Sequence, residues 1–165
     1  MSQQVDTLDF TPRVLGFADY VSGPFGLGVM VERATANLPQ TTAHALFTIS
    51  GGRIALVQIV GQVTTVIQTQ ANNTKLIGNP TVGTDVDLCA VLSITAKEVG
   101  TLFGITGVFA DALLGANAGA LSGQDRRVIL NVGTLDLSCA ASNTGQVKWT
   151  LFYHPIDPGA LVVAA

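Results

Sequence analysis

The chain has 165 residues, of which 48% are hydrophobic and only 12% are charged, and its formal net charge is −3. This length suits one domain that buries roughly 70% of its unfolded surface, and the slightly acidic balance argues against a nucleic-acid site, which normally gathers Lys and Arg. No window of about 20 residues avoids repeated Gln, Thr, Asn or Gly, so we expect neither a membrane span nor a membrane partner.

Residues 1–40 differ in pattern from the rest of the chain. They contain Pro12, Pro24 and Pro39 and show no lasting period, so continuous regular structure is not expected. The segment is nevertheless too aromatic for a solvated linker. We therefore expect either an extended arm that lies across another surface or an irregular lead-in that covers one end of its own core. The candidate interaction residues of this arm are Phe10, Leu15, Phe17, Tyr20 and Phe25.

A β-domain is predicted for residues 41–165. In its first strand the apolar residues alternate up to the turn pair Gly51-Gly52, which joins this strand to the next one. Residues 74–77, 88–95 and 101–106 are predicted to form shorter strands. The segment 110–123 is rich in small residues, and its composition fits a short helix and a loop equally well.

An uncharged run of 21 residues lies between Arg53 and Lys75. Alternate positions of this run form one nearly continuous apolar series, which predicts a long strand with one apolar face. The members of the apolar series are Ala55, Val57, Ile59, Val63 and Ile67. The other face mixes apolar residues with Gln and Thr, and we expect this uncharged outer surface to meet other subunits. Its candidate contact residues are Gln58, Gln62 and Gln68.

The last third of the chain predicts an antiparallel meander. The apolar phase changes at Gly133, where a turn or bulge must lie to keep both sets facing the core. Further on, Val147, Trp149, Leu151 and Tyr153 alternate inward. Because short strands recur with no long amphipathic helix, the fold class is all-β, an antiparallel β-sandwich or jelly-roll-like domain with an extended N-terminal arm.

Sequence signatures of common enzyme classes are missing. No serine stands in a G-x-S-x-G context, and no Gly-Lys pair of a phosphate-binding loop occurs. Cys89, Cys139, His44 and His154 stand singly, which favours two buried thiols and two surface histidines over a zinc site. We therefore expect a non-enzymatic protein with no cofactor and no metal.

Three stretches of the strand-rich region resemble small structural proteins of tailed-bacteriophage virions. They are LFTISGGRIALVQIVGQVTT (46–65), TKLIGNPTVGTDVDLCAVL (74–92) and TGQVKWTLFYHPIDPGALVVAA (144–165). Their order along the chain matches too, whereas residues 1–30 lie outside the matched stretches.

The resemblance best implies a capsid decoration, or cement, protein. Such proteins are typically β-rich and often trimeric, and they sit on the shell between capsomers at three-fold or quasi-three-fold points. The resemblance thus implies a homotrimer that binds the major capsid protein of the same phage and no nucleic acid. Its place would be the capsid surface of the virion, after assembly in the host cytoplasm. A tail, neck, baseplate or fibre-base component and a glycan-binding module are the alternatives.

Overall fold

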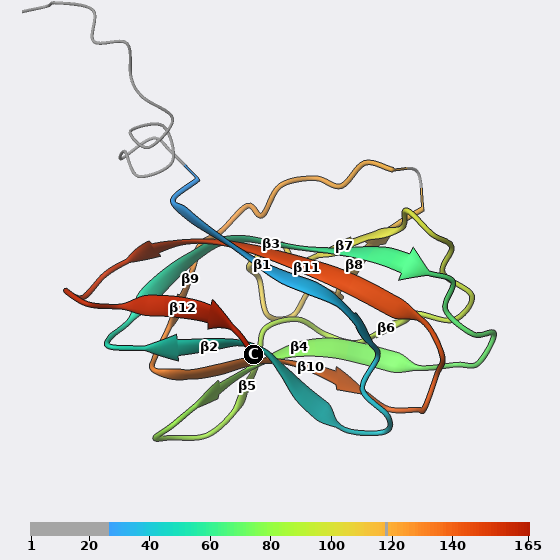
Figure 1. Cartoon of the computed structure of the whole chain (residues 1–165), viewed down its shortest axis with the longest axis horizontal. Helices are drawn as coiled ribbons and strands as arrows, with labels where there is room; N and C mark the ends of the chain where they lie inside the picture. The colour runs from blue at the N-terminus through green and yellow to red at the C-terminus, as the bar shows by residue number, and fades with distance from the viewer. Residues whose placement is uncertain (1–26, 118) are drawn as a thin grey trace, which may run out of the picture.

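The computed structural model describes residues 27–117 and 119–165. In this part of the chain twelve strands form two six-stranded antiparallel sheets, which pack together as a β-sandwich (Figure 1). The predicted all-β sandwich is confirmed. Residues 1–26, with the five candidate residues of the predicted arm, lie outside the described residues.

The first sheet holds the longest strand of the described chain. Its members are β1 (Val29–Asn37), β3 (Ile54–Thr65), β7 (Leu102–Gly104), β8 (Leu114–Ala116), β9 (Val128–Leu130) and β11 (Gln146–Pro155). The strand order is β1-β11-β3-β7-β8, and β9 pairs with the first residues of β3. The segment 110–123, which fitted a helix or a loop, thus contributes the short edge strand β8.

The second sheet is built around β10. Its members are β2 (Ala43–Ser50), β4 (Asn73–Pro80), β5 (Val86–Asp87), β6 (Leu92–Ser93), β10 (Gly133–Cys139) and β12 (Leu161–Ala164). The strand order is β12-β2-β10-β4-β5, and β6 pairs with the start of β4. The predicted continuous strand over residues 88–95 is wrong, because only β6 is regular there.

Consecutive strands alternate between the two sheets from β1 to β4 and again from β9 to β12. The predicted meander of the last third is therefore wrong, since neighbours in sequence are not neighbours in a sheet. Gly133 does lie at the predicted phase change. Its φ is +151°, and a Cβ atom at this position would lie only 2.2 Å from the carbonyl oxygen of Asn79. Glycine thus lets the chain cross tightly from β9 in one sheet to β10 in the other.

The core between the sheets is filled by the inward sides of the long strands. The predicted inward set of β11, namely Val147, Trp149, Leu151 and Tyr153, is at most 2% exposed. Its outward neighbours are half-buried, which confirms the alternation. The thiols of Cys89 and Cys139 are free and buried in this core, also as predicted.

The predicted apolar face of β3 is correct for only half of the strand. Ile59 and Val63 are buried, but so are Ile54 and Leu56, which belong to the opposite predicted series. The cause is a shift in the β3–β11 register between Leu56 and Gln58. The extra residue, Val57, reverses the phase, so both halves of the strand present apolar side chains to the core.

The sandwich begins earlier than the predicted boundary at residue 41. The expectation of irregular chain up to residue 40 is wrong for Val29–Asn37, which form β1 and pair with β11 along their length. Pro24 and Pro39 lie on either side of this segment, and no proline lies within it. All of its backbone N–H groups are therefore available to a sheet.

Candidate binding surface

The two ends of the sandwich are built differently, and the difference locates the candidate site. Paired residues place Val29, Tyr153, Leu56 and Val128 in one row across β1, β11, β3 and β9. We call this the pocket end; β4 ends and β10 begins here, and it lies on the left in Figure 1. The opposite end, formed by the loops 38–42, 66–72 and 140–145, is the clasp end.

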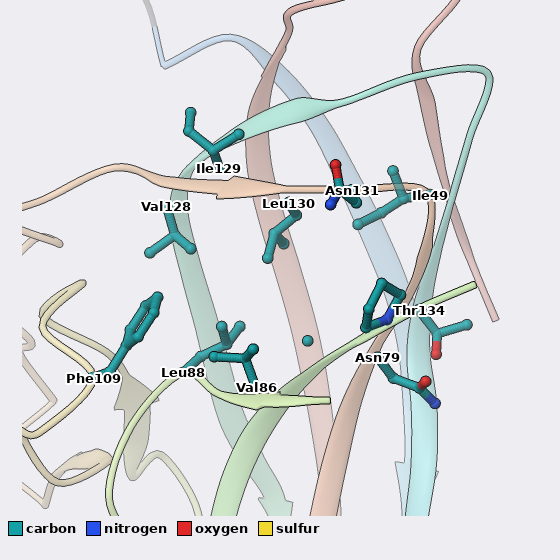
Figure 2. A pocket seen from close by; sticks show the side chains of 12 residues that line it. Ile49, Asn79, Val86, Leu88, Phe109, Val128, Ile129, Leu130, Asn131 and Thr134 are labelled. Carbon is teal, nitrogen blue, oxygen red and sulfur yellow. The ribbon is translucent and has the colours of Figure 1, made fainter. Parts of the chain in front are cut away.

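An apolar pocket of about 160 Å³ opens at the pocket end (Figure 2). Its inner wall consists of the buried side chains of Ile49, Leu88, Val128 and Leu130. In Figure 2 the side chains of Val128 and Leu130 point from β9 into this space. The pocket is therefore a part of the sandwich core that the chain's own described side chains leave open.

A glycine helps to keep this space open. Gly78 in β4 lines the pocket, and a Cβ atom there would lie 3.4 Å from Leu130 Cδ2 and 3.5 Å from Leu88 Cδ2. These are ordinary van der Waals distances, so a side chain at this position would occupy part of the pocket. The backbone of β4 would accept it, because the φ of Gly78 is not positive.

The rim of the pocket carries apolar side chains that face solvent. Val86 is 45% exposed and Phe109 is 47% exposed, whereas the side chain of Ile129, which is 56% exposed, points away from the pocket in Figure 2. Figure 2 shows Phe109 on one side of the pocket and the polar residues Asn79 and Thr134 on the other. An apolar floor with an apolar rim and a polar side is a surface suited to a side chain of a partner protein.

The size of the pocket limits what it can bind. Small-molecule sites commonly measure about 300–1,000 Å³. An apolar protein cavity of about 150 Å³ is known to hold one benzene-sized molecule. The pocket therefore suits a single aromatic ring or a branched aliphatic side chain better than a cofactor.

A second pocket, of about 270 Å³, lies between the edge strand β1 of the first sheet and β2 of the second sheet. Two of its polar side chains, those of Arg33 and Gln40, hold parts of the sandwich together. Arg33 Nε donates to the carbonyl oxygen of Ala165 at 3.2 Å, and Gln40 Nε2 donates to the carbonyl oxygens of Leu38 and Asn143. We interpret this pocket as a structural gap at the sandwich edge.

The clasp end is closed by two asparagines that are 0% exposed, Asn72 and Asn143. Asn72 Nδ2 donates to Ala141 O at 2.9 Å and to Asn143 Oδ1 at 3.2 Å. Asn143 Nδ2 donates in turn to the carbonyl oxygens of Gln68 and Gln70. These bonds give hydrogen-bond partners to the carbonyl oxygens of Ala141 and Gln70 and add a further donor to that of Gln68, which also accepts from the backbone N–H groups of Gln70 and Ala96.

The pocket end carries an ion pair at the turn beside β3. Asp157 accepts hydrogen bonds from the backbone N–H of Arg53 at 2.8 Å and from its guanidinium at 2.7 and 2.9 Å. These bonds hold the pKa of the Asp157 carboxyl well below its usual range. The pair joins the β2–β3 turn to the chain between β11 and β12.

The predicted contact residues of β3 do not form one surface. Gln58 and Gln62 lie on the outer face of the first sheet, opposite Phe152 and Lys148 of β11. Gln68 lies beyond the end of β3, and its Oε1 accepts a hydrogen bond from the backbone N–H of Thr144. Its expected place on that face is wrong, because the strand ends at Thr65.

The expectation that this outer face is uncharged is also wrong. Lys148 Nζ of β11 lies 2.7 Å from Glu32 Oε2 of β1, beside the uncharged Gln62. The charge comes from neighbouring strands, which the sequence of β3 alone does not reveal. The same face also exposes Met30 of β1, opposite Phe152.

The sequence analysis missed the pocket and its rim. Val86, Phe109 and Ile129 are far apart in the chain, and none of them was among the predicted contact residues. No local pattern links them, since packing of the two sheets brings them together.

In the described ranges, no group of three or more His, Cys, Asp or Glu residues is placed to hold a metal ion. No helix in the described ranges could cross a membrane.

Comparisons with protein-family models, with curated proteins and with solved structures found no match for this chain.

Proposed function

We propose that this chain is a non-enzymatic structural protein of a phage particle, which decorates and stabilises the capsid shell as a homotrimer. One observation of the structure carries the proposal. An apolar pocket sized for a single side chain is surrounded by exposed apolar residues, which is a surface for binding protein. The resemblance of three stretches to virion structural proteins supplies the biological setting.

The physical role follows from linkage. A protein that binds only the assembled shell stabilises it by mass action, as any ligand stabilises the state that it prefers. Each contact can be modest, because a subunit held by several neighbours gains from their combined effect. Apolar contacts also depend little on salt, since ionic screening acts on charges. A side-chain pocket with an apolar rim is therefore suited to bridging capsomers.

Binding to shells tests the proposal. The full-length protein is added to shells of the same phage assembled without it, and bound and free protein are separated by sedimentation. We expect saturable attachment, a copy number that follows the number of capsomers, and a mass of three chains for the free protein. A stable monomer that does not attach would contradict the proposal, and a few copies confined to the tail would assign the chain to another part of the virion.

A further inference from the structure

We infer that the apolar pocket binds an aromatic side chain from residues 1–25 of a second copy of this chain. The inference rests on the proposed function, which brings copies together. The aromatic residues of that segment are Phe10, Phe17, Tyr20 and Phe25.

The pocket matches an aromatic side chain in size and chemistry. Its volume of about 160 Å³ is close to that of the apolar cavity that holds benzene. Leu88, Val128 and Leu130 provide an apolar wall for the ring, whereas Asn131 and Thr134 line another side. A tyrosine needs both kinds of wall, because its hydroxyl group seeks a hydrogen-bond partner when its ring is buried. Tyr20 is therefore the first residue to test.

The start of the described chain lies at the same end as the pocket. Val29 shares a row with Val128, and three strand spacings of about 4.8 Å separate them by about 14 Å. The 26 residues that precede Leu27 can span at most about 90 Å when fully extended. The segment of one copy is therefore long enough to reach the pocket of a neighbouring copy in the proposed homotrimer.

The rim indicates a second copy rather than a segment folding back onto its own chain. Beyond the pocket itself, Val82 is 87% exposed and lies two residues after the lining residue Pro80, and Val132 is 38% exposed and directly follows the lining residue Asn131. One ring would fill the pocket but leave this apolar surface in water. A second copy brings an aromatic side chain together with further surface of its own, which can cover the apolar rim.

Disulfide trapping between differently tagged copies tests the inference. One copy carries Val21→Cys, which keeps the ring of Tyr20 beside it, the other carries Phe109→Cys, and the two are co-expressed and oxidised. We expect a covalent dimer with both tags, at a yield at least fivefold above that of a control pair. The control replaces Phe109→Cys by Val66→Cys, which is similarly exposed, at 53%, but lies near the clasp end. Cys89 and Cys139 are buried, and burial raises the pKa of both thiols, so they react slowly.

A pocket-filling variant provides the matched test of the binding mode. Gly78→Val places a side chain in the pocket and leaves the rim unchanged. We expect the trapping yield to fall at least fivefold while the protein stays folded by circular dichroism. Gly78→Ala, which intrudes less, serves as the second variant if the valine protein fails to fold. An unchanged yield in the folded pocket-filled protein would overturn the inference.

Two further outcomes separate this inference from the proposed function. A chain that carries both cysteines and closes its disulfide only within one copy would overturn the inference. So would equal trapping at Val66→Cys and Phe109→Cys. If either occurs while the full-length protein still attaches to shells, the inference fails and the proposed function stands. If trapping succeeds and attachment fails, the inference stands and the capsid role fails.

Discussion

The clasp end and the pocket end complete the same sandwich by opposite means. At the clasp end, Asn72 and Asn143 are completely buried and join the loops 66–72 and 140–145 through their side-chain amides. At the pocket end, the core continues into a gap whose rim holds Phe109 and Val86 in solvent. A buried polar network fixes one arrangement of its loops, whereas an open apolar surface lowers its free energy by meeting a partner. The clasp end therefore contributes chiefly to stability, and the pocket end is the surface at which we propose binding.

Removing the clasp should have the largest effect on stability. Asn143→Ala removes the side-chain donor to Gln70 O, one of three donors to Gln68 O and one of the two acceptors of Asn72 Nδ2. We expect the free energy of unfolding to fall by about 3 kcal/mol, because three buried or part-buried hydrogen bonds are lost and each contributes about 1 kcal/mol. Urea denaturation followed by circular dichroism measures it.

The matched control lies at the pocket end. Asn131→Ala changes an exposed asparagine, and we expect it to alter stability by less than about 0.5 kcal/mol. Equal losses in the two variants would contradict the assignment of stability to the clasp end.

Two glycine-to-alanine variants compare close packing with open space. A Cβ atom on Gly61 of β3 would lie 2.8 Å from the ring of Trp149, whereas one on Gly78 meets nothing closer than 3.4 Å. We expect Gly61→Ala to destabilise the protein by about 2 kcal/mol through overpacking. Gly78→Ala should be neutral or stabilising by about 0.5 kcal/mol, because it restricts the unfolded chain.

Thermal unfolding of both variants measures this difference. A clear loss of stability in Gly78→Ala would show that the pocket is already filled by the chain itself.

Acid should weaken the ion pair of the pocket end, with the smallest effect of the three. The folded-state pKa of Asp157 is depressed by Arg53, so the pair stabilises the protein above the ordinary Asp pKa of about 3.9. This contribution is lost as the pH falls through the folded-state pKa. Both side chains are partly exposed, so we expect a shift of the melting temperature by only a few degrees.

The measurement is the melting temperature of the wild type and of Asp157→Asn from pH 7 down to pH 2. The two curves should be separated at neutral pH and approach each other in acid. A constant separation over the whole range would show that the carboxyl of Asp157 acts through its packing alone.

The sequence predicted local features well where a strand stays in register. The alternation in β11 identified four core residues, because in a regular strand every second side chain points to the same face and the apolar set is the one that is buried. These residues are Val147, Trp149, Leu151 and Tyr153. In β3 the same reasoning failed at Val57, where the register shifts against β11. A bulge depends on the partner strand, so no pattern within β3 reveals it.

The binding surface was less predictable than the fold. Gln68 was assigned to a sheet face on the assumption that β3 continues, whereas it bonds to the backbone N–H of Thr144. Phe109 and Val86 carried no signal, because a pocket is defined by residues from several segments. The aromatic residues of the N-terminal segment were singled out from the sequence, but the pocket that we propose for one of them was not.

The sequence by itself determined that this chain is an all-β protein with little charge, since alternating apolar side chains and frequent turns leave no other way to bury the core. The tertiary structure alone decided which strands are neighbours, because crossing from sheet to sheet depends on contacts between residues far apart in the chain. It also decided where the core stays open. Whether the pocket exists depends on how Gly78, Leu88 and Leu130 meet, and their distances follow from the packing of two sheets rather than from any local pattern.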